Sequence, residues 1–398
     1  MYGLGLFNRA ATAIFLLYQN FQNSIRCLLL PKILKTYRES CLHNMQRMIE
    51  QRSADLHTRF ATLRAAWWPA IRAQMDELIR ESGSDDSLLR QMAAYHLRAE
   101  GKGLRAILPL LIAEALGVPA SRLVPFGAAC EMLHNASLVH DDLQDGDQMR
   151  RGQTAIWKKF GMPQAINLGD AMIAYTILLM HRLDVPPGLR ERATTRLLLE
   201  MLRVIEGQVQ DLELKVQPEV TLADYMQMVE GKTSRLFALP MGGAALLCGA
   251  SEEVERGLIE AACHIGVLFQ IQDDILDIYG DKRRESPGND IREGKRSVLV
   301  VHCLETVPAE AAAWLKQVLD KPRSRTTAQD IARVRAMFDS AGSLTFALSE
   351  LTRRRAAALA VPGLAAYPAL YEVLDEACRL FLQPVAALFP ATFAAPAS

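Results

Sequence analysis

Apolar residues recur at helical spacing along most of the chain, from about Gln46 to Leu382. Alternating apolar and polar runs, which are typical of strands, are few. Short Gly and Pro clusters interrupt the pattern, for example at 117–119, 161–163 and 186–188, and no long linker separates two regions of different composition. The pattern therefore predicts an all-α fold, with the helices gathered in a single-domain bundle.

Residues 1–44 differ in composition from the rest of the chain. They carry five Lys and Arg residues but one acidic residue, Glu39, around apolar runs shorter than the ~20 residues that span a bilayer. We predict an N-terminal extension at 1–44 that lies outside the domain, a domain at 45–385, and an Ala/Pro-rich tail at 386–398. A targeting or membrane-surface role for the extension is the alternative.

Charge and cysteine content narrow the class of protein. The 398 residues contain 45 basic and 45 acidic side chains, so no overall charge attracts nucleic acid or an anionic membrane. The seven cysteines are scattered and form no C-x-x-C pair. We therefore expect reduced thiols in a cytoplasmic protein, without a nucleic-acid partner or a transmembrane span.

Two acidic motifs carry the candidate chemistry. The spacing D-D-x-x-D occurs in HDDLQD and again in QDDILD, each time after an apolar helical stretch, so we expect the carboxylates of each motif to share one helix face. Six acids at one site repel one another unless cations neutralise them, and oxygen ligands without His or Cys favour Mg²⁺. The predicted metal ligands are Asp141, Asp142, Asp145, Asp273, Asp274 and Asp277. Two solvated acidic helix faces are the alternative.

Basic side chains near these motifs suggest binding sites for two polyanions. Arginine and lysine bind phosphate groups directly, while Mg²⁺ bridges phosphate oxygens to carboxylates. A neutral histidine can also donate a hydrogen bond to phosphate, although His134 by itself is equally well explained as an ordinary helix residue. The candidate residues are Lys102, Arg105, His134, Arg150, Arg151, Lys232 and Lys295.

The order of the motifs resembles the trans-isoprenyl diphosphate synthase, or polyprenyl synthetase, family. It reads GKGLR, HDDLQD, RRG, GQVQDL, GKT, FQIQDDILD and GNDIREGK, over roughly Leu88 to Leu304. The resemblance implies the isoprenoid synthase fold, an all-helical domain around a central cavity, normally in a homodimer. It also implies condensation of isopentenyl diphosphate with an allylic diphosphate (dimethylallyl, geranyl or farnesyl), assisted by about three Mg²⁺ ions per site.

The resemblance assigns roles residue by residue. Asp141, Asp145 and Asp273 match the principal Mg²⁺ ligands, with Asp142, Asp274 and Asp277 in support. Arg150 and Lys232 match the clamp on the allylic diphosphate, and Lys295 lies in a further basic motif. Lys102, Arg105, His134 and Arg151 match the isopentenyl diphosphate site. Thr233 and Gln270 match groups whose oxygens face the developing carbocation, and Gln208 and Asp211 border the cavity.

Two segments depart from the family pattern. Where the family has G-G-K-R-x-R-P, this chain reads EGKGLRA, so that Gly103 stands in place of the first arginine. The loop after the second acidic motif has Glu285 in place of a lysine, and the preceding Lys282, Arg283 and Arg284 are candidates for its replacement.

Side chains one turn before Asp141 suggest the product length. Members of the family that stop at the C15 product resemble each other in placing a bulky aromatic residue there, whereas Ala136 and Ser137 are small. Leu133 and Met132 are the next side chains that could close the bottom of the cavity for the prenyl chain. The residues below them, Cys130 and Ala129, are small again. We therefore expect an enzyme of the geranylgeranyl diphosphate synthase type, with a C20 or longer product.

Two other functions fit parts of the pattern. A terpene cyclase on the same fold needs no second diphosphate site. The chain retains the residues of such a site, which argues against a cyclase: Lys102, Arg105, His134 and Arg151. A non-catalytic subunit that binds prenyl ligands needs no complete acidic motifs, and both are complete here. Turnover by the purified chain alone separates these possibilities.

Overall fold

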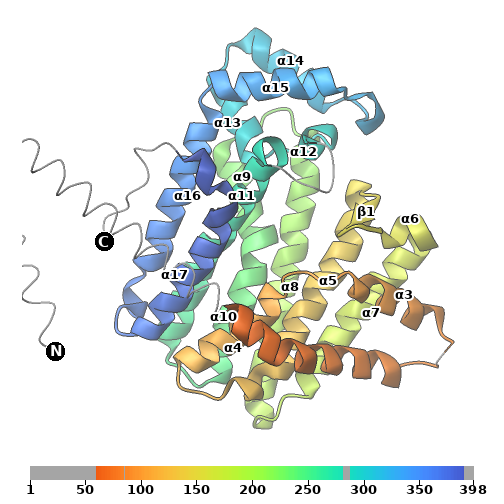
Figure 1. Cartoon of the computed structure of the whole chain (residues 1–398), viewed down its shortest axis with the longest axis vertical. Helices are drawn as coiled ribbons and strands as arrows, with labels where there is room; N and C mark the ends of the chain where they lie inside the picture. The colour runs from red at the N-terminus through yellow and green to blue at the C-terminus, as the bar shows by residue number, and fades with distance from the viewer. Residues whose placement is uncertain (1–59, 85, 281–286, 390–398) are drawn as a thin grey trace, which may run out of the picture. The chain divides into compact units, whose positions relative to one another are not determined.

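Helices form nearly all the regular structure in the described part of the chain (Figure 1). The computed structural model describes residues 60–84, 86–280 and 287–389, all within one compact unit at 57–398. The predicted extension at 1–44, the loop residues 282–285 and most of the tail at 386–398 lie outside the described residues. The all-α prediction is confirmed.

The first half of the described chain builds one side of the bundle. Residues 60–81 are helical, and a short 3₁₀ turn, η1, spans Ala120–Leu123. The helices that follow are α3 (Leu88–Arg98), α4 (Leu104–Ala115), α5 (Val124–Asp145), α6 (Ile156–Phe160), α7 (Met162–His181) and α8 (Pro187–Val216). Helix α5 packs along α7 and against α4, which places the end that carries the first acidic motif within the bundle.

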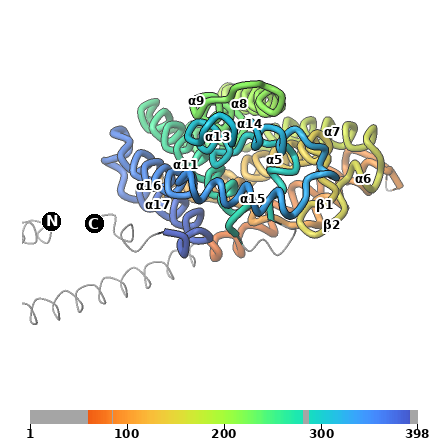
Figure 2. The backbone as a smooth tube through the Cα atoms, turned by 90° about the horizontal axis from the view of Figure 1, so that it is seen from above, coloured from red at the N-terminus to blue at the C-terminus, as the bar shows by residue number. Residues whose placement is uncertain are grey.

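The second half completes the bundle. Its helices are α9 (Leu222–Val229), α10 (Arg235–Leu247), α11 (Glu252–Tyr279), α12 (Asn289–Arg292), α13 (Val298–Thr306), α14 (Ala309–Leu319), α15 (Ala328–Ser340), α16 (Ser343–Leu359) and α17 (Pro368–Leu382). A π-turn, η2 (Glu230–Ser234), joins α9 to α10, and 3₁₀ turns occupy Arg323–Arg325 (η3), Pro362–Leu364 (η4) and Gln383–Leu388 (η5). Helix α11 packs between α10 and α16, and in Figure 2 α14 and α15 cross one end of the bundle.

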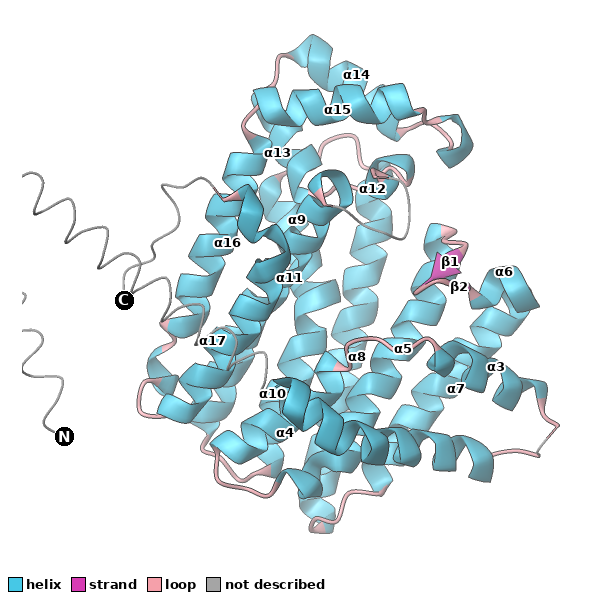
Figure 3. Ribbon diagram, viewed as in Figure 1, coloured by secondary structure: helices cyan, strands magenta, loops and turns pink. Residues whose placement is uncertain are grey.

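A two-stranded hairpin is the one sheet in the described ranges (Figure 3). Strands β1 (Met149–Arg150) and β2 (Gln153–Thr154) are antiparallel and are joined by Arg151 and Gly152, whose φ angles are 52° and 77°. Two positive φ values match the turn that suits a two-residue hairpin loop. The hairpin follows α5 directly, so it holds the two consecutive arginines beside the first acidic motif.

The bundle is held together by a single cluster of buried apolar side chains that extends through all the long helices. Burial of such side chains provides the main favourable free energy of folding. In the described part of the chain, no helix combines the length and the apolar character that crossing a membrane requires. The five cysteines in that part are free thiols.

Candidate active site

Two glycines bring helices α8 and α11 close to the π-turn η2. A Cβ atom on Gly207 of α8 would lie 2.1 Å from the backbone nitrogen of Lys232, and one on Gly266 of α11 would lie 2.4 Å from Cα of Ser234. Only glycine permits these approaches. One helical turn further along each helix stand Asp211 and Gln270, which therefore reach the side chains of the π-turn. π-Turns within helices are frequent at functional sites.

Lys232 connects three elements through its ammonium group. Its Nζ lies 2.7 Å from the carboxylate of Asp211 on α8 and 3.0 Å from that of Asp141 at the end of α5. Burial alone would lower the pKa of Lys232, but these carboxylates raise it above its ordinary value. The lysine is therefore charged at neutral pH and stands beside the first acidic motif.

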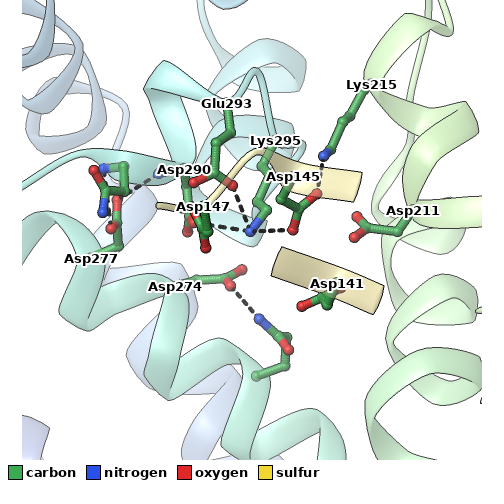
Figure 4. A network of polar contacts seen from close by, with 12 residues as sticks. Asp141, Asp145, Asp147, Asp211, Lys215, Asp274, Asp277, Asp290, Glu293 and Lys295 are labelled. Carbon is green, nitrogen blue, oxygen red and sulfur yellow. Dashed lines mark hydrogen bonds and ion pairs between the residues drawn. The ribbon is translucent and has the colours of Figure 1, made fainter. Parts of the chain in front are cut away.

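Asp145, one turn after Asp141, lies between two further lysines. Lys215 Nζ donates to its carboxylate at 2.6 Å, and Lys295 Nζ lies 3.4 Å away (Figure 4). Burial opposes ionisation, but Lys295, Lys232 and Lys215 together hold the pKa of Asp145 well below its usual range. Lys295 also pairs with Glu293 at 2.8 Å. Asp145 is thus an ionised carboxylate in a strongly positive environment.

Asp142 points to a different neighbour from Asp141 and Asp145. It is buried, and Arg150 of β1 donates to it through two nitrogens, with Nε at 2.7 Å. Burial raises the pKa of Asp142 to about 6, against the influence of Arg150. Adjacent helix positions differ by about 100°, which explains why the three carboxylates of this motif do not all share one face.

The second acidic motif divides in a similar way. The buried carboxylate of Asp274 accepts hydrogen bonds from Gln270 Nε2 at 2.9 Å, Tyr225 Oη at 2.8 Å and the amide of Val298 at 2.9 Å. Gln270 Oε1 in turn accepts from Thr233 Oγ1 at 2.8 Å. Burial, with Asp290 nearby, raises the pKa of Asp274 to about 7. These bonds fix the end of α11 against α9, η2 and α13.

Asp277 and Asp273 flank this network. The buried Asp277 accepts from the amides of Asn289 and Asp290, each at 3.2 Å, and so anchors the start of α12. Asp273 is exposed and lines a pocket. The residues around that pocket are Asp211, Tyr225, Met228, Lys232, Gln270, Asp273, Asp274, Asp290, Lys295, Arg296 and Ser297. The lining therefore comes from residues 211–297, and Lys232, which also lies 3.0 Å from Asp141, connects this pocket to the first acidic motif.

The donor atoms of the acidic residues are chemically suited to a hard divalent cation. These atoms are carboxylate oxygens, which Mg²⁺ prefers, and Asp141 and Asp273 are the members of the two motifs most open to solvent. In the ranges that the structure describes, no three His, Cys, Asp or Glu side chains already converge as a metal site. Lysines balance the negative charge instead.

A second polar cluster is formed by residues of α4 and α5. Arg105 at the start of α4 and His134 on α5 are 3.2 Å apart through Nη1 and Nε2, and the guanidinium of Arg105 lies over the ring of Phe237. Burial lowers the pKa of His134 well below its ordinary value and that of Arg105 to about 10. Here a neutral histidine stands beside a charged arginine.

Arg151 belongs to this second cluster although it follows Arg150 directly. Its Nη1 donates to the carbonyl of Ala99 at 2.9 Å, and its guanidinium lies against Gly101. A φ of 52° is uncommon for a residue with a side chain and disfavours arginine at this position. Such backbone strain concentrates at functional sites. The hairpin thus directs one arginine to each cluster.

Buried polar atoms without a hydrogen-bond partner concentrate in the second cluster. They include His96 Nε2, Arg105 Nε, Glu131 Oε2, His134 Nδ1 and Asn135 Oδ1. Buried polar groups in proteins are nearly always paired with protein atoms, water or a ligand. The sequence pattern pointed to Arg105 and His134 but missed the other three, since Glu131 and Asn135 fall among ordinary helix positions.

The sequence pattern also missed two cations of the first cluster, which consists of the two acidic motifs and the basic side chains around them. Lys215 lies one turn after Asp211 on α8, so helical periodicity could have found it. Arg323 comes from η3, yet its Nη1 lies 2.9 Å from Asp147 and 3.3 Å from Glu293. No local pattern links residue 323 to the acidic motif, because the contact depends on how α14 and η3 fold back over the bundle.

The remaining predicted residues are placed as follows. Lys102 is exposed beside the second cluster, and Gln208 on α8 donates to Gln144 at 2.8 Å. Ala136, Leu133 and Met132 on α5 are buried, while Ser137 is half-buried and donates to the carbonyl of His134. The positions that bear on product length therefore lie within the bundle.

Comparison with known proteins agrees with this geometry. The model of the family described as Polyprenyl synthetase matches residues 86–337. The chain belongs to the polyprenyl synthetase family. It is 36% identical over 236 residues to a geranylgeranyl pyrophosphate synthase of Geoglobus acetivorans, an alignment of 59% of this chain and 73% of the relative. It is 32% identical over 305 residues to a (2E,6E)-farnesyl diphosphate synthase of Mycobacterium bovis, covering 72% and 81%.

Solved structures of the family share the fold. The crystal structure of a geranylgeranyl pyrophosphate synthetase from Pyrococcus horikoshii superimposes with a TM-score of 0.72 at 27% identity, over 81% of this chain and 98% of that one. This polyprenyl synthetase therefore has the isoprenoid synthase fold, and it is a prenyltransferase of the isoprenyl diphosphate synthase type. The relatives differ in product, so the family alone does not assign a chain length.

Proposed function

We propose that this polyprenyl synthetase is a Mg²⁺-dependent enzyme that condenses isopentenyl diphosphate with an allylic diphosphate to give geranylgeranyl diphosphate and inorganic diphosphate. The observation that carries the proposal is the divergence of two consecutive arginines. Arg150 donates to Asp142 of the first acidic motif, whereas Arg151 donates to the carbonyl of Ala99 and adds to the lowering of the pKa of both Arg105 and His134. Two separate cationic sites suit two diphosphates, one on each substrate.

The first cluster suits the allylic diphosphate. Asp141, Asp145 and Asp273 are the proposed principal ligands of bound Mg²⁺, with Asp142, Asp274 and Asp277 in support. Bound Mg²⁺ supplies positive charge that neutralises the leaving diphosphate. Arg150 and Lys232 then exchange carboxylate partners for phosphate oxygens, and Lys295 adds to the positive field. The hydrogen bonds to Asp274 hold α11 in place while this exchange occurs.

The reaction depends on positive charge at the leaving diphosphate and on exclusion of water from the site, more than on a nucleophilic side chain. The allylic C–O bond breaks with its electron pair on the diphosphate oxygen, whose charge Arg150 and Lys232 stabilise. The double bond of isopentenyl diphosphate attacks the allylic carbon and forms the new C–C bond. The proton lost next to that bond passes to the departing diphosphate. Thr233 and Gln270, bonded to each other at 2.8 Å, offer oxygens to the transient cation.

The second cluster suits isopentenyl diphosphate. Lys102, Arg105 and Arg151 provide positive charge, and neutral His134 provides a hydrogen-bond donor. Four residues at such a site serve no purpose in a cyclase that ionises a single diphosphate. The concentration of unpartnered buried atoms at this cluster also favours a polar ligand there.

A C20 product is favoured by the small side chains at the first turn below Asp141. Ala136 and Ser137 leave room along α5, and Leu133 with Met132 offers the next floor. The relatives support a product of this range, because they include a geranylgeranyl pyrophosphate synthase and a farnesyl diphosphate synthase.

A homodimer is favoured by an exposed apolar stripe on α8. Leu199, Leu202, Ile205 and Val209 are each between 44% and 58% exposed and fall within one face of the helix. Met162 and Ile166 on α7, a helix that contacts α8, are further exposed apolar residues. A large apolar patch of this kind on an otherwise charged protein is typical of a protein–protein interface.

The decisive experiment is turnover by the purified chain alone. With isopentenyl diphosphate, Mg²⁺ and dimethylallyl, geranyl or farnesyl diphosphate, we expect prenyl diphosphate chains to lengthen to C20. A cyclase would convert a prenyl diphosphate to a hydrocarbon without using isopentenyl diphosphate, and a regulatory subunit would bind the ligands without turnover. Lys102→Ala and Arg151→Ala should raise the KM for isopentenyl diphosphate more than the KM for the allylic substrate.

A further inference from the structure

The loop at 100–103, which departs from the family pattern, is contacted by two residues one turn apart on helix 60–81. Arg64 Nη2 lies 3.2 Å from the carboxylate of Glu100, where the pattern has glycine. Trp68 packs on Gly103, where the pattern has arginine, since a Cβ there would lie 2.6 Å from the indole ring. The same segment of helix therefore contacts both positions at which the loop departs from the family pattern.

The conformation of Gly103 and the position of Trp68 prevent an ordinary side chain at this place. Gly103 has a φ of 66° and caps α4 in the left-handed region, which disfavours any residue with a Cβ. The Trp68 ring also occupies the space into which such a side chain would project. A cation at position 103 would need a different loop and a displaced tryptophan.

Arg64 brings a guanidinium to the same loop by another route. Its Nη2 lies 3.4 Å from the carbonyl oxygen of Gly101, and its Cζ lies 5.1 Å from the centre of the Trp68 ring. Stacking on an aromatic face orients arginine while leaving its edges free to donate. Nε of Arg64 is buried without a hydrogen-bond partner, so this guanidinium has a donor to spare.

Arg64 and Arg151 meet at one glycine. A Cβ on Gly101 would lie 2.6 Å from Nη2 of Arg151, and the carbonyl of the same residue faces Nη2 of Arg64. Lys102 follows directly in the chain. Since like charges gathered at one place repel, such an arrangement favours a bound anion. The carboxylate of the exposed Glu100 lies 3.2 Å from Arg64, and an exposed ion pair of this kind is weak.

We infer that Arg64 is a substrate-binding residue that replaces the cation absent at Gly103 and binds the diphosphate of isopentenyl diphosphate together with Lys102 and Arg151. This inference rests on the proposed function. Glu100 then holds Arg64 in the free enzyme and competes with the diphosphate for it. Trp68 acts as a positioning residue through its contact with the guanidinium.

The test compares three variants on the full chain by initial-rate kinetics. Arg64→Gln should raise the KM for isopentenyl diphosphate about tenfold, the loss expected for one hydrogen bond between charged groups, and leave the allylic KM unchanged. Arg64→Lys should restore part of the loss. The matched control is Arg72→Gln on the same helix, since Arg72 bonds Asp76 and the carbonyl of Leu97. It should leave both KM values unchanged.

Glu100→Gln distinguishes substrate binding from a structural tether. If Arg64 binds the diphosphate, freeing it from Glu100 should lower the KM for isopentenyl diphosphate or leave it unaltered, opposite to Arg64→Gln. If the Arg64–Glu100 pair merely holds the loop, both variants should raise it alike, and the inference is then wrong. Thermal unfolding of each variant verifies that it is folded.

Calorimetric binding of isopentenyl diphosphate keeps this inference separate from the proposed function. Wild-type protein that binds the ligand but gives no product would contradict the function, and weaker binding by Arg64→Gln would still support the role of Arg64. Equal binding by wild type and Arg64→Gln would overturn that role even in an active enzyme. Absence of binding to the wild type would overturn both.

Discussion

The Nζ atom of Lys232 lies 3.0 Å from Oδ1 of Asp141, and this contact joins the π-turn η2 to the end of α5. Lys232, Lys215 and Lys295 come from three segments of the chain. Their ammonium groups balance the negative charge of the first acidic motif. A diphosphate bound with Mg²⁺ must therefore exchange partners with these lysines. The anion and the metal should consequently bind together more tightly than either does alone.

Metal and anion should stabilise the protein cooperatively. We expect Mg²⁺ alone to raise the Tm little and Mg²⁺ with inorganic diphosphate to raise it by several degrees, because only the pair neutralises both acids and lysines. Differential scanning calorimetry measures this shift. Asp141→Ala and Asp273→Ala should abolish it.

Activity should follow the same requirement. EDTA should remove activity and Mg²⁺ should restore it, while Asp141→Ala or Asp273→Ala should lower kcat about a thousandfold or more. The control is Asp184→Ala, which removes an exposed carboxylate in the loop before α8. Zinc-dependent turnover without any response to Mg²⁺ would contradict the oxygen-ligand assignment.

Product length should respond to the size of residue 136. Ala136→Phe places an aromatic ring one turn below Asp141, so we expect the product to shorten from C20 to C15, measured by chromatography of dephosphorylated products. Leu178→Phe provides the control, since it enlarges an exposed side chain on α7. An unshortened product from Ala136→Phe would place the floor elsewhere, for instance near the buried Tyr175.

The apolar stripe on α8 should hold two copies together. Leu202→Asp puts a charge at the centre of the stripe, where Leu202 is 58% exposed, and we expect it to convert the dimer into a monomer in light scattering after gel filtration. Tyr371→Asp on α17, which alters an exposed aromatic away from the stripe, should leave the dimer intact. A monomeric wild-type protein would contradict the proposal.

The protein should become less stable as the pH decreases, because of His96. Burial lowers the pKa of His96 to about 3, with Arg151 and Arg150 adding to the effect. The unfolded chain binds a proton near pH 6.5 that the folded protein excludes, so this contribution to stability is present at neutral pH. It is lost as the pH falls below about 6.5, at about 1.4 kcal/mol per unit.

His96→Gln should therefore reduce this slope of the free energy of unfolding against pH. Urea unfolding at pH 7, 6 and 5 measures the slope, and His181→Gln, which removes an exposed imidazole, should leave it as in the wild type. Identical slopes for His96→Gln and wild type would show that His96 gains its proton in the folded state as readily as in the unfolded chain.

The sequence by itself determined the helical class and the two acidic motifs. Helical spacing of apolar residues and the repeated D-D-x-x-D pattern are local properties, and local spacing is preserved when a chain folds into helices. The same spacing placed Asp141 and Asp145 together. The sequence also contains the consecutive Arg150 and Arg151, but it did not show that their side chains turn to different clusters.

Tertiary structure decided which partners these residues have. Asp142 turns to Arg150, Asp145 turns to Lys215 and Lys295, and Asp274 is held by Tyr225. The contacts of Arg64 with Glu100 and of Trp68 with Gly103 likewise join segments that share no sequence signal. Such pairs depend on how closely whole helices approach, and that distance is set by buried surfaces and glycine contacts far from the motifs themselves.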